Sequence, residues 1–268
     1  QEQEGVYVSL EQKRYSMEWL TTLTNRNAIR LLRRGLENAS DTIYPPRCPI
    51  CEQLVESEGM ACDECLSRLK YIVSPFCMVC GKQLDDELRE VCEDCAKKRH
   101  YFIRGVAAFS YTREIKQSMY RFKYDGQREY ARFYAELLYK LKGHIIASWK
   151  PQVIIPVPLH AGRYRKRGYN QAALVAHRLG RLMNIPVDET LLVRTKNTLP
   201  QKALNDRERS KNIKNAFHTA PDIGKYKRIL LVDDIYTTGA TLDECSQAIK
   251  AVHSADIYFA AVCVGRGF

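Results

Sequence analysis

The sequence has 268 residues, of which 45% are hydrophobic, and its 42 Lys and Arg residues outnumber its 31 Asp and Glu residues to give a net charge of +11. This length suits one large domain or two small ones, and the basic balance predicts an anionic partner such as nucleic acid, a phosphorylated metabolite or anionic lipid. No apolar run approaches the ~20 residues of a membrane span, and no charged-then-apolar signal pattern is found, so we expect a cytoplasmic protein without a transmembrane segment.

Residues 1–44 form an N-terminal extension that we expect to be helical from about Met17 to Leu36. The apolar residues of this segment roughly share one face, and Arg30, Arg33 and Arg34 form a basic cluster. Such a helix packs against protein more often than it contacts anionic lipid, which is the alternative. The sequence leaves the role of this extension open.

Eight of the ten cysteines occur as four Cys-x-x-Cys pairs within residues 45–100, which we interpret as a double zinc ribbon. A Cys-x-x-Cys turn places two thiolates on one metal, and two turns complete a tetrahedral site, so we expect about two structural zinc ions. The first two pairs are separated by 10 residues and the last two by 11, as in a tandem duplication. Sequential pairing is expected, and an interleaved cross-brace is the alternative. The expected ligands are Cys48, Cys51, Cys62 and Cys65 for one site, and Cys77, Cys80, Cys92 and Cys95 for the other.

A strand is expected at 105–111, followed by a helix that breaks at Gly126 and a second helix at 129–141. Between them, Tyr120 to Gly126 interleaves aromatic and basic residues. Such residues can stack on and neutralise single-stranded nucleic acid, but they also serve as the core-facing and partly exposed residues of ordinary helices. The sequence leaves both interpretations open.

The run at 153–157 predicts a buried strand, after which the basic segment Arg163–Gln171 leads into a helix to about Met183. A strand, a cationic loop and a helix can together bind an anion, and a solvated basic loop is the alternative. We expect an edge strand at 190–194 and then a long polar span. The histidines at 160, 177, 218 and 253 have no ligand-like spacing, so a structural role is expected.

A second strand–loop–helix unit lies at 228–252. Ile229–Val232 is an apolar run typical of a buried parallel strand, and Asp233 and Asp234 come at its expected carboxyl end. The Thr- and Gly-rich loop 237–241 then enters a helix whose apolar face includes Leu242, Cys245, Ile249 and Val252. Backbone N–H groups and hydroxyls at a helix N-terminus can hold a phosphate, although an ordinary capped turn is the alternative. A final strand is expected at 257–264.

The stretch Val232–Thr241 resembles the phosphoribosyl pyrophosphate (PRPP) signature of type I phosphoribosyltransferases, and the chain from about Cys48 onward is similar to the ComF family of bacterial competence proteins. The resemblance implies that Asp233 and Asp234 bind the ribose hydroxyls, while Thr237, Thr238, Gly239, Ala240 and Thr241 surround the 5′-phosphate. It also implies a pyrophosphate loop and a mobile hood. The pyrophosphate-loop residues are Leu159, His160, Arg165, Arg167, Gly168, Asn170 and Gln171, and the hood residues are Gln201, Arg209 and Asn212.

The fold that follows is a double zinc ribbon and then, at 101–268, a doubly wound, mostly parallel α/β domain of the type I phosphoribosyltransferase kind. The resemblance implies a protein of DNA uptake that binds PRPP with magnesium, single-stranded DNA and a competence helicase, in the cytoplasm or at the inner face of the membrane. The alternative is an active phosphoribosyltransferase. Its catalytic residues are unknown, since Thr237 stands where the 6-oxopurine enzymes have an Asp base. A PRPP-sensing regulator would need a DNA-binding module, and no helix-turn-helix signal is found.

Overall fold

The computed structural model of the protein describes residues 46–55, 60–196 and 215–265. The chain divides into two units, of which one holds residues 1–48 and 52–59 and the other holds residues 49–51 and 60–268. The helix expected at 17–36 and the expected hood residues Gln201, Arg209 and Asn212 lie outside the described residues. All helices and strands that the structure describes belong to the larger unit.

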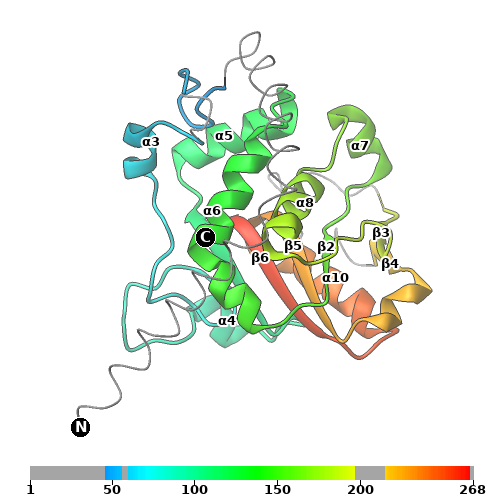
Figure 1. Ribbon diagram of the computed structural model, residues 1–268. Helices are drawn as coiled ribbons and strands as arrows, with labels where there is room; N and C mark the ends of the chain where they lie inside the picture. The colour runs from blue at the N-terminus through cyan, green and yellow to red at the C-terminus, as the bar shows by residue number, and fades with distance from the viewer. Residues whose placement is uncertain (1–45, 56–59, 197–214, 266–268) are drawn as a thin grey trace, which may run out of the picture. The chain divides into compact units, whose positions relative to one another are not determined.

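Four parallel strands form the central sheet of the larger unit (Figure 1). Across the sheet, the order is β1 (Arg104–Ser110), β6 (Asp256–Val264), β5 (Arg228–Tyr236) and β2 (Val153–Pro156). All neighbouring strands run parallel. Their short apolar runs are buried because helices or other chain segments cover both faces of the sheet. The α/β class with a parallel sheet, expected from the sequence, is confirmed.

One face of the sheet is covered by two helices that pack side by side, α6 (Tyr130–Ser148) and α8 (Gln171–Met183) (Figure 1). The helix α5 (Arg113–Tyr124) precedes α6, and Thr112 caps its first turn by accepting a hydrogen bond from the Ile115 N–H. Among the helices that the structure describes, none is both long and apolar enough to cross a membrane.

The other face packs against α10 (Ala240–Lys250) and against the segment that carries the last four expected zinc ligands. Leu231 of β5 and Phe259 of β6 share a buried cluster with Leu242 and Ile249 of α10. Cys77, Cys80 and Cys92 belong to the same cluster, as do Ile72 and Leu84. The second half of the cysteine-rich region thus forms part of the core of the α/β unit.

Shorter elements complete the described part of the chain. They are α3 (Asp63–Arg68), α4 (Glu93–Lys97), α7 (Ala161–Arg167), the 3-10 helix η2 (Pro221–Lys225), and the antiparallel pair β3 (Leu192–Arg194) and β4 (Phe217–Thr219).

The structure corrects four expectations about these elements. The basic segment expected to be a loop is helical over Ala161–Arg167, because the His160 side chain accepts from the Gly162 N–H at its start and Gly168, in the left-handed conformation, ends it. The helix expected at 129–141 continues to Ser148. The strand expected at the sheet edge, β3, belongs instead to a separate two-stranded sheet. Val252 lies beyond α10 and is 65% exposed, so it is no part of the apolar face.

Candidate functional site: an acidic pair, a threonine loop and surrounding cations

Strand β5 carries the acidic pair, Asp233 and Asp234, into the site. The strand was expected to end at Val232, but it continues to Tyr236 because β6 pairs with it as far as Val264. Its other neighbour, β2, ends opposite Val232. The two acids therefore lie beyond the carboxyl end of β2 while their backbone stays fixed by β6. This is the sheet edge at which α/β proteins bind ligands.

The two carboxylates have different surroundings. Asp234 forms an ion pair with Lys123 of α5, with 2.6 Å between the Nζ and carboxylate atoms and both side chains about 15% exposed. Asp233 accepts the backbone N–H of Asp234 at 2.8 Å. Burial, together with the charge of Asp234, raises the pKa of Asp233 to about 7. The pair thus combines Asp234, whose charge is balanced by Lys123, with Asp233, whose carboxyl group is about half ionised at neutral pH.

The threonine loop, Thr237–Thr241, links the acidic pair to α10. Gly239 precedes the helix with a φ of 78°, and the N–H of Asp243 in the first helical turn donates to its carbonyl at 2.8 Å. A side chain at Gly239 would lie 2.8 Å from the Tyr236 hydroxyl, so this position requires glycine by both conformation and space. A loop of this kind at the start of an 11-residue helix presents N–H groups to an anion.

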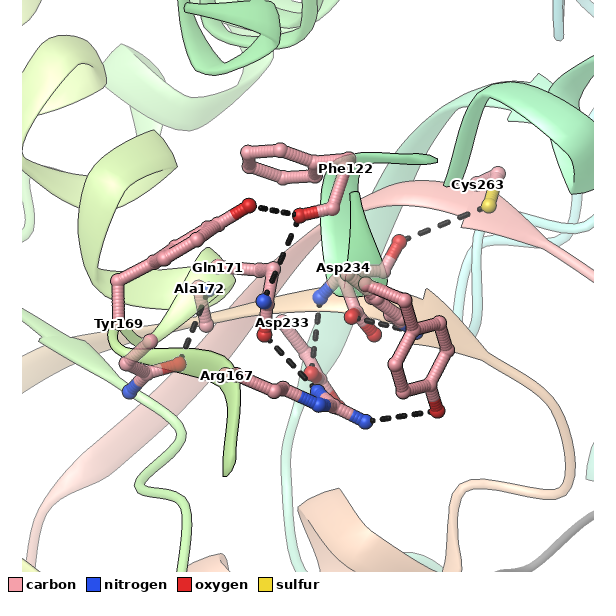
Figure 2. Close-up of polar contacts among 11 residues, drawn as sticks. Phe122, Arg167, Tyr169, Gln171, Ala172, Asp233, Asp234 and Cys263 are labelled. Carbon is pink, nitrogen blue, oxygen red and sulfur yellow. Dashed lines mark hydrogen bonds and ion pairs between the residues drawn. The ribbon is translucent and has the colours of Figure 1, made fainter. Parts of the chain in front are cut away.

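The basic segment Arg163–Gln171 lies in the same region as the acidic pair (Figure 2). Arg167 donates to the Gln171 side chain at 2.9 Å and to the Tyr124 hydroxyl at 3.1 Å, with its guanidinium over the Tyr124 ring. Figure 2 shows Arg167 and Gln171 in the same neighbourhood as Asp233 and Asp234. Residues of α7, α8 and β5 therefore lie near one another in this view, and their roles in binding stay a prediction.

Other expected residues of this segment have structural contacts. The Asn170 side chain donates to the Val157 carbonyl at 3.0 Å and accepts the Ala172 N–H at 3.1 Å, which caps α8 and joins it to the end of β2. His160 caps α7, and Gly168 ends it. Arg165 is exposed in α7, and Leu159 is half-buried just before it. Of the seven residues expected to form the pyrophosphate loop, Figure 2 shows Arg167 and Gln171 in the neighbourhood of the acidic pair.

Two further arginines belong to this charged region, and one of them, Arg194, interacts with Asp233. Arg194, at the end of β3, lies over the Phe217 ring, and burial and the nearby charge of Arg163 lower its pKa to about 10. Burial and Arg167 lower the pKa of Arg163. Cations packed closely enough to lower one another's pKa are an energetic cost that a bound anion relieves. The charges of Arg194 and Lys123 also act on Asp233, opposing the rise of its pKa.

Lys123 was not among the residues expected from the sequence to form the site, whereas Arg163 begins the basic segment that was expected to bind an anion, and Arg194 ends the strand expected at 190–194. A signal for Lys123 was present, because it lies within the aromatic and basic stretch 120–126. The sequence does not predict that Lys123 pairs with Asp234, because the two residues are far apart in the chain.

The eight expected zinc ligands form two groups in the sequential pairing. The first cysteine group is Cys48, Cys51, Cys62 and Cys65, the second is Cys77, Cys80, Cys92 and Cys95, and in each the ligand atoms lie within 4.8 Å of one another. The sulfur atoms of Cys51 and Cys62 are 3.7 Å apart, and those of Cys80 and Cys92 are 3.6 Å apart. Four thiolates about 2.3 Å from a tetrahedral zinc ion lie roughly 3.8 Å from one another. Both groups therefore fit structural zinc.

Known proteins resemble most of this chain. The family described as a double zinc ribbon domain matches residues 39–96. Competence protein F of Haemophilus influenzae is 33% identical over 76% of this chain and 90% of its own length. Competence protein ComFC of Bacillus subtilis is 30% identical over 70% and 77%, and the DNA utilization protein YhgH of Salmonella typhi is 28% identical over 82% and 97%.

Among solved structures, a purine phosphoribosyltransferase from Pyrococcus horikoshii covers 51% of this chain and 82% of its own, with 18% identity and a TM-score of 0.33. The relatives in sequence are aligned over most of both chains. At this identity and coverage, the protein belongs to the ComF family of competence proteins.

Proposed function

We propose that this protein acts in DNA uptake, as a cytoplasmic component that binds PRPP at the acidic pair and threonine loop and single-stranded DNA across the adjacent basic surface. The names of its relatives, which refer to competence and DNA utilization, support the process. The main support for PRPP as the ligand is that Asp233 and Asp234 directly precede a loop at the N-terminus of α10. The cations Arg163, Arg167 and Arg194 belong to the same region. A competence helicase at the inner face of the membrane is the proposed partner.

The acidic pair suits the ribose of PRPP. Adjacent carboxylates can accept hydrogen bonds from the two vicinal hydroxyls, and Lys123 holds Asp234 in place at 2.6 Å. Magnesium binds through one or two carboxylates together with substrate phosphates, so these acids also fit a magnesium ion that arrives with PRPP. The ion would neutralise charge on the pyrophosphate group. In this arrangement the threonine loop receives the 5′-phosphate, and Arg163, Arg167 and Arg194 receive the pyrophosphate.

Calorimetric titration with magnesium and PRPP tests this assignment. We expect Asp233→Asn and Asp234→Asn each to weaken binding by roughly 1–3 kcal/mol, the scale of a hydrogen bond to a charged group. Asp222→Asn is the matched control, because Asp222 is paired with Lys225 on the exposed helix η2. Equal affinity in the wild type and both site variants would contradict the proposal.

The pH dependence provides a second test. Because the pKa of Asp233 is about 7, its carboxylate becomes the main form as pH rises from 6 to 8, and we expect PRPP affinity to rise over this range. Since PRPP itself also titrates, the decisive quantity is the difference between the wild type and Asp233→Asn. That difference should grow with pH. A constant difference would show that ionisation of Asp233 does not contribute to binding.

Single-stranded DNA is tested by binding as a function of salt. Affinity should fall with a log–log slope near roughly −0.7 per phosphate neutralised, and Arg165→Glu with Lys166→Glu should reduce both affinity and slope. Both residues are exposed in α7, and Tyr120 and Tyr124 of α5 provide exposed aromatic rings for stacking. Millimolar PRPP should compete with the DNA if both bind at the acidic pair and threonine loop. Dependence on Lys97 and Arg99, without competition, would place the DNA on the zinc ribbon instead.

An active phosphoribosyltransferase is the second candidate. The observation that favours it is the Asp233 pKa of about 7, since acid–base groups work best near the ambient pH. Release of pyrophosphate from PRPP in the presence of a nucleobase separates the candidates, because binding alone releases none. Pyrophosphate release without any binding of single-stranded DNA at low salt would reject the competence-adaptor proposal in favour of the enzyme.

A further inference from the structure

Asp243, in the first turn of α10, is buried and binds groups outside its own helix. Its carboxylate accepts the Lys98 Nζ at 2.6 Å, the His100 Nδ1 at 3.0 Å and the Tyr101 N–H at 3.1 Å. Only 9% of the Asp243 side chain and 3% of the His100 side chain are exposed. An acidic residue in a first turn commonly interacts with the helix end itself. Here the carboxylate instead holds the segment 98–101, which directly follows α4 of the second cysteine group.

His100 contacts that cysteine group with its other ring nitrogen. Its Nε2 lies 3.5 Å from the Cys95 sulfur, while its ring stacks on Phe102 with 4.5 Å between the centroids. A side chain packed against a metal-binding sulfur fixes the orientation of that ligand and adjusts the strength of the metal bond. His100 thus lies between an expected zinc ligand on one side and a carboxylate of α10 on the other.

The same histidine touches the threonine loop. A Cβ atom added to Gly239 would lie 3.2 Å from the Cε1 of His100 and 2.8 Å from the Tyr236 hydroxyl. The Asp243 N–H donates to the Gly239 carbonyl at 2.8 Å, so the carboxylate and the loop backbone belong to one hydrogen-bonded turn. Movement of the second cysteine group would therefore reach the loop by two routes, through the His100 ring and through Asp243.

We propose that His100 and Asp243 are positioning residues that join the second cysteine group to the threonine loop, so that metal in this group and a phosphate on the loop strengthen each other's binding. The proposal rests on the proposed function in that it takes the loop as the 5′-phosphate site. By thermodynamic linkage, a phosphate ligand must stabilise the metal by the same factor by which the metal stabilises the phosphate ligand. This reciprocity makes the inference measurable from the metal side.

The test uses the zinc-loaded full chain and ribose 5-phosphate as the probe, with zinc affinity measured by equilibrium competition with a chromophoric chelator. Cys51→Ser, which disables the first cysteine group, identifies the zinc affinity of the second. Saturating ribose 5-phosphate should raise that affinity by about tenfold in the wild type, the scale of effects from groups next to metal ligands. Asp243→Asn and His100→Phe should remove the increase, and Asp222→Asn, at an exposed ion pair, should keep it.

Two measurements separate positioning from a general loss of structure. In Asp243→Asn, affinity for ribose 5-phosphate should fall about tenfold while affinity for inorganic pyrophosphate at the basic segment stays unchanged, and Asp243→Glu should restore part of the loss. Amide hydrogen exchange of residues 237–243 should speed up in this variant, and also in the wild type after zinc is removed from the second group. Neither measurement requires the protein to turn over a substrate.

The outcomes distinguish the two proposals. If the wild type binds no ribose 5-phosphate, the proposed function fails, and the exchange of residues 237–243 still decides whether the cysteine group holds the loop. If the wild type binds it, but zinc affinity and loop exchange are the same in Asp243→Asn, His100→Phe and the wild type, the link is rejected while the PRPP site stands. Equal losses of ribose 5-phosphate and pyrophosphate binding would also reject it.

Discussion

The turns that open the two cysteine groups, at Cys48 and at Cys77, have the same backbone but different neighbours. In each, the first cysteine donates its N–H to the carbonyl five residues later and accepts the N–H four residues later, all at 2.8 Å. The donor at the fourth position is left-handed in both, with a φ of 65° at Glu52 and 71° at Gly81. The repeats also place α3 and α4 directly after Cys62 and Cys92, each with extended φ and ψ.

The difference is burial. Glu52 is exposed, whereas Gly81 is buried against β1, where an added Cβ would lie 2.8 Å from the Val106 Cα. Cys51 is likewise exposed, and its counterpart Cys80 is 1% exposed within the core cluster. The same local turn therefore forms with or without glycine. What requires glycine is the close approach of a strand, so the comparison separates local conformation from tertiary packing.

Loss of a zinc ligand should show the largest difference between the groups. Cys80→Ser should destabilise the sheet by several kcal/mol, because metal-linked folding energy of roughly 10–16 kcal/mol is coupled there to the shared core. Cys51→Ser, or Cys48→Ser, should unfold the first ribbon locally and leave the sheet folded. Elemental analysis should give about two zinc ions in the wild type, from the four-ligand rule.

Urea unfolding followed by circular dichroism measures the stability of the sheet in each variant. Wild-type stability in Cys80→Ser would show that the second group is not part of the core in solution. Full stability of the zinc-free protein would show that zinc does not contribute to folding in either cysteine group.

Gly81→Ala should have the next largest effect. A left-handed non-glycine residue costs about 1–2 kcal/mol, and forcing a methyl group against the Val106 backbone adds about 1–3 kcal/mol. Glu52→Ala is the matched control, since its φ is similar and its side chain is exposed, so its stability should change by no more than about 0.5 kcal/mol. The free energy of unfolding of both zinc-loaded variants is the measurement. Similar losses in the two would attribute the glycine to local conformation.

The two groups should also differ in their response to pH. Buried Lys142 donates to the Ile72 carbonyl at 2.8 Å and lies over the Phe76 ring, next to the second turn, and burial lowers its pKa to about 8. Arg121 donates to the Pro49 and Ile50 carbonyls, next to the first turn, and is the matched cation there.

The unfolded state holds the Lys142 proton up to a pH of about 10.5, so the folded protein should gain stability as pH rises from 8 to 10.5. Relative to Lys142→Met, this gain should reach about 2–3 kcal/mol. Arg121→Met should differ from the wild type by a pH-independent amount. Urea unfolding at pH 7 and pH 10 measures both differences, and a pH-independent effect of Lys142→Met would refute the assignment.

The smallest difference is expected from ion pairs at the two groups. Lys82 pairs with Asp94 in the second group, and its side chain is 18% exposed, whereas Arg68 pairs with Glu64 in α3 with side chains 66% and 73% exposed. Lys82→Ala should cost no more than about 1 kcal/mol and Arg68→Ala less than about 0.5 kcal/mol. Double-mutant cycles at low and high salt measure both coupling energies. A stronger pair at Arg68 would reverse the expected order.

The candidate site shows the same division between local and tertiary determinants. The carboxylates of Asp233 and Asp234, the Gly239 turn and the start of α10 were all predicted, because each depends on residues within one strand–loop–helix unit. The partners Lys123 of Asp234 and His100 of Asp243 were not predicted. Both contacts depend on how separate elements pack on the sheet, and no short-range pattern encodes that packing.

By itself the sequence determined the chemistry that local geometry controls. Cys-x-x-Cys turns bring two sulfurs together within one turn, and a buried apolar run followed by acids and a Thr-Gly loop places two carboxylates and a helix N-terminus at one edge of the sheet. Only the tertiary structure decided which distant groups neutralise the charges of these residues or hold them in place. It buried the second cysteine group under the sheet, made the basic segment a helix, and gave Asp233 a pKa of about 7, because desolvation and charge depend on neighbours from distant parts of the chain.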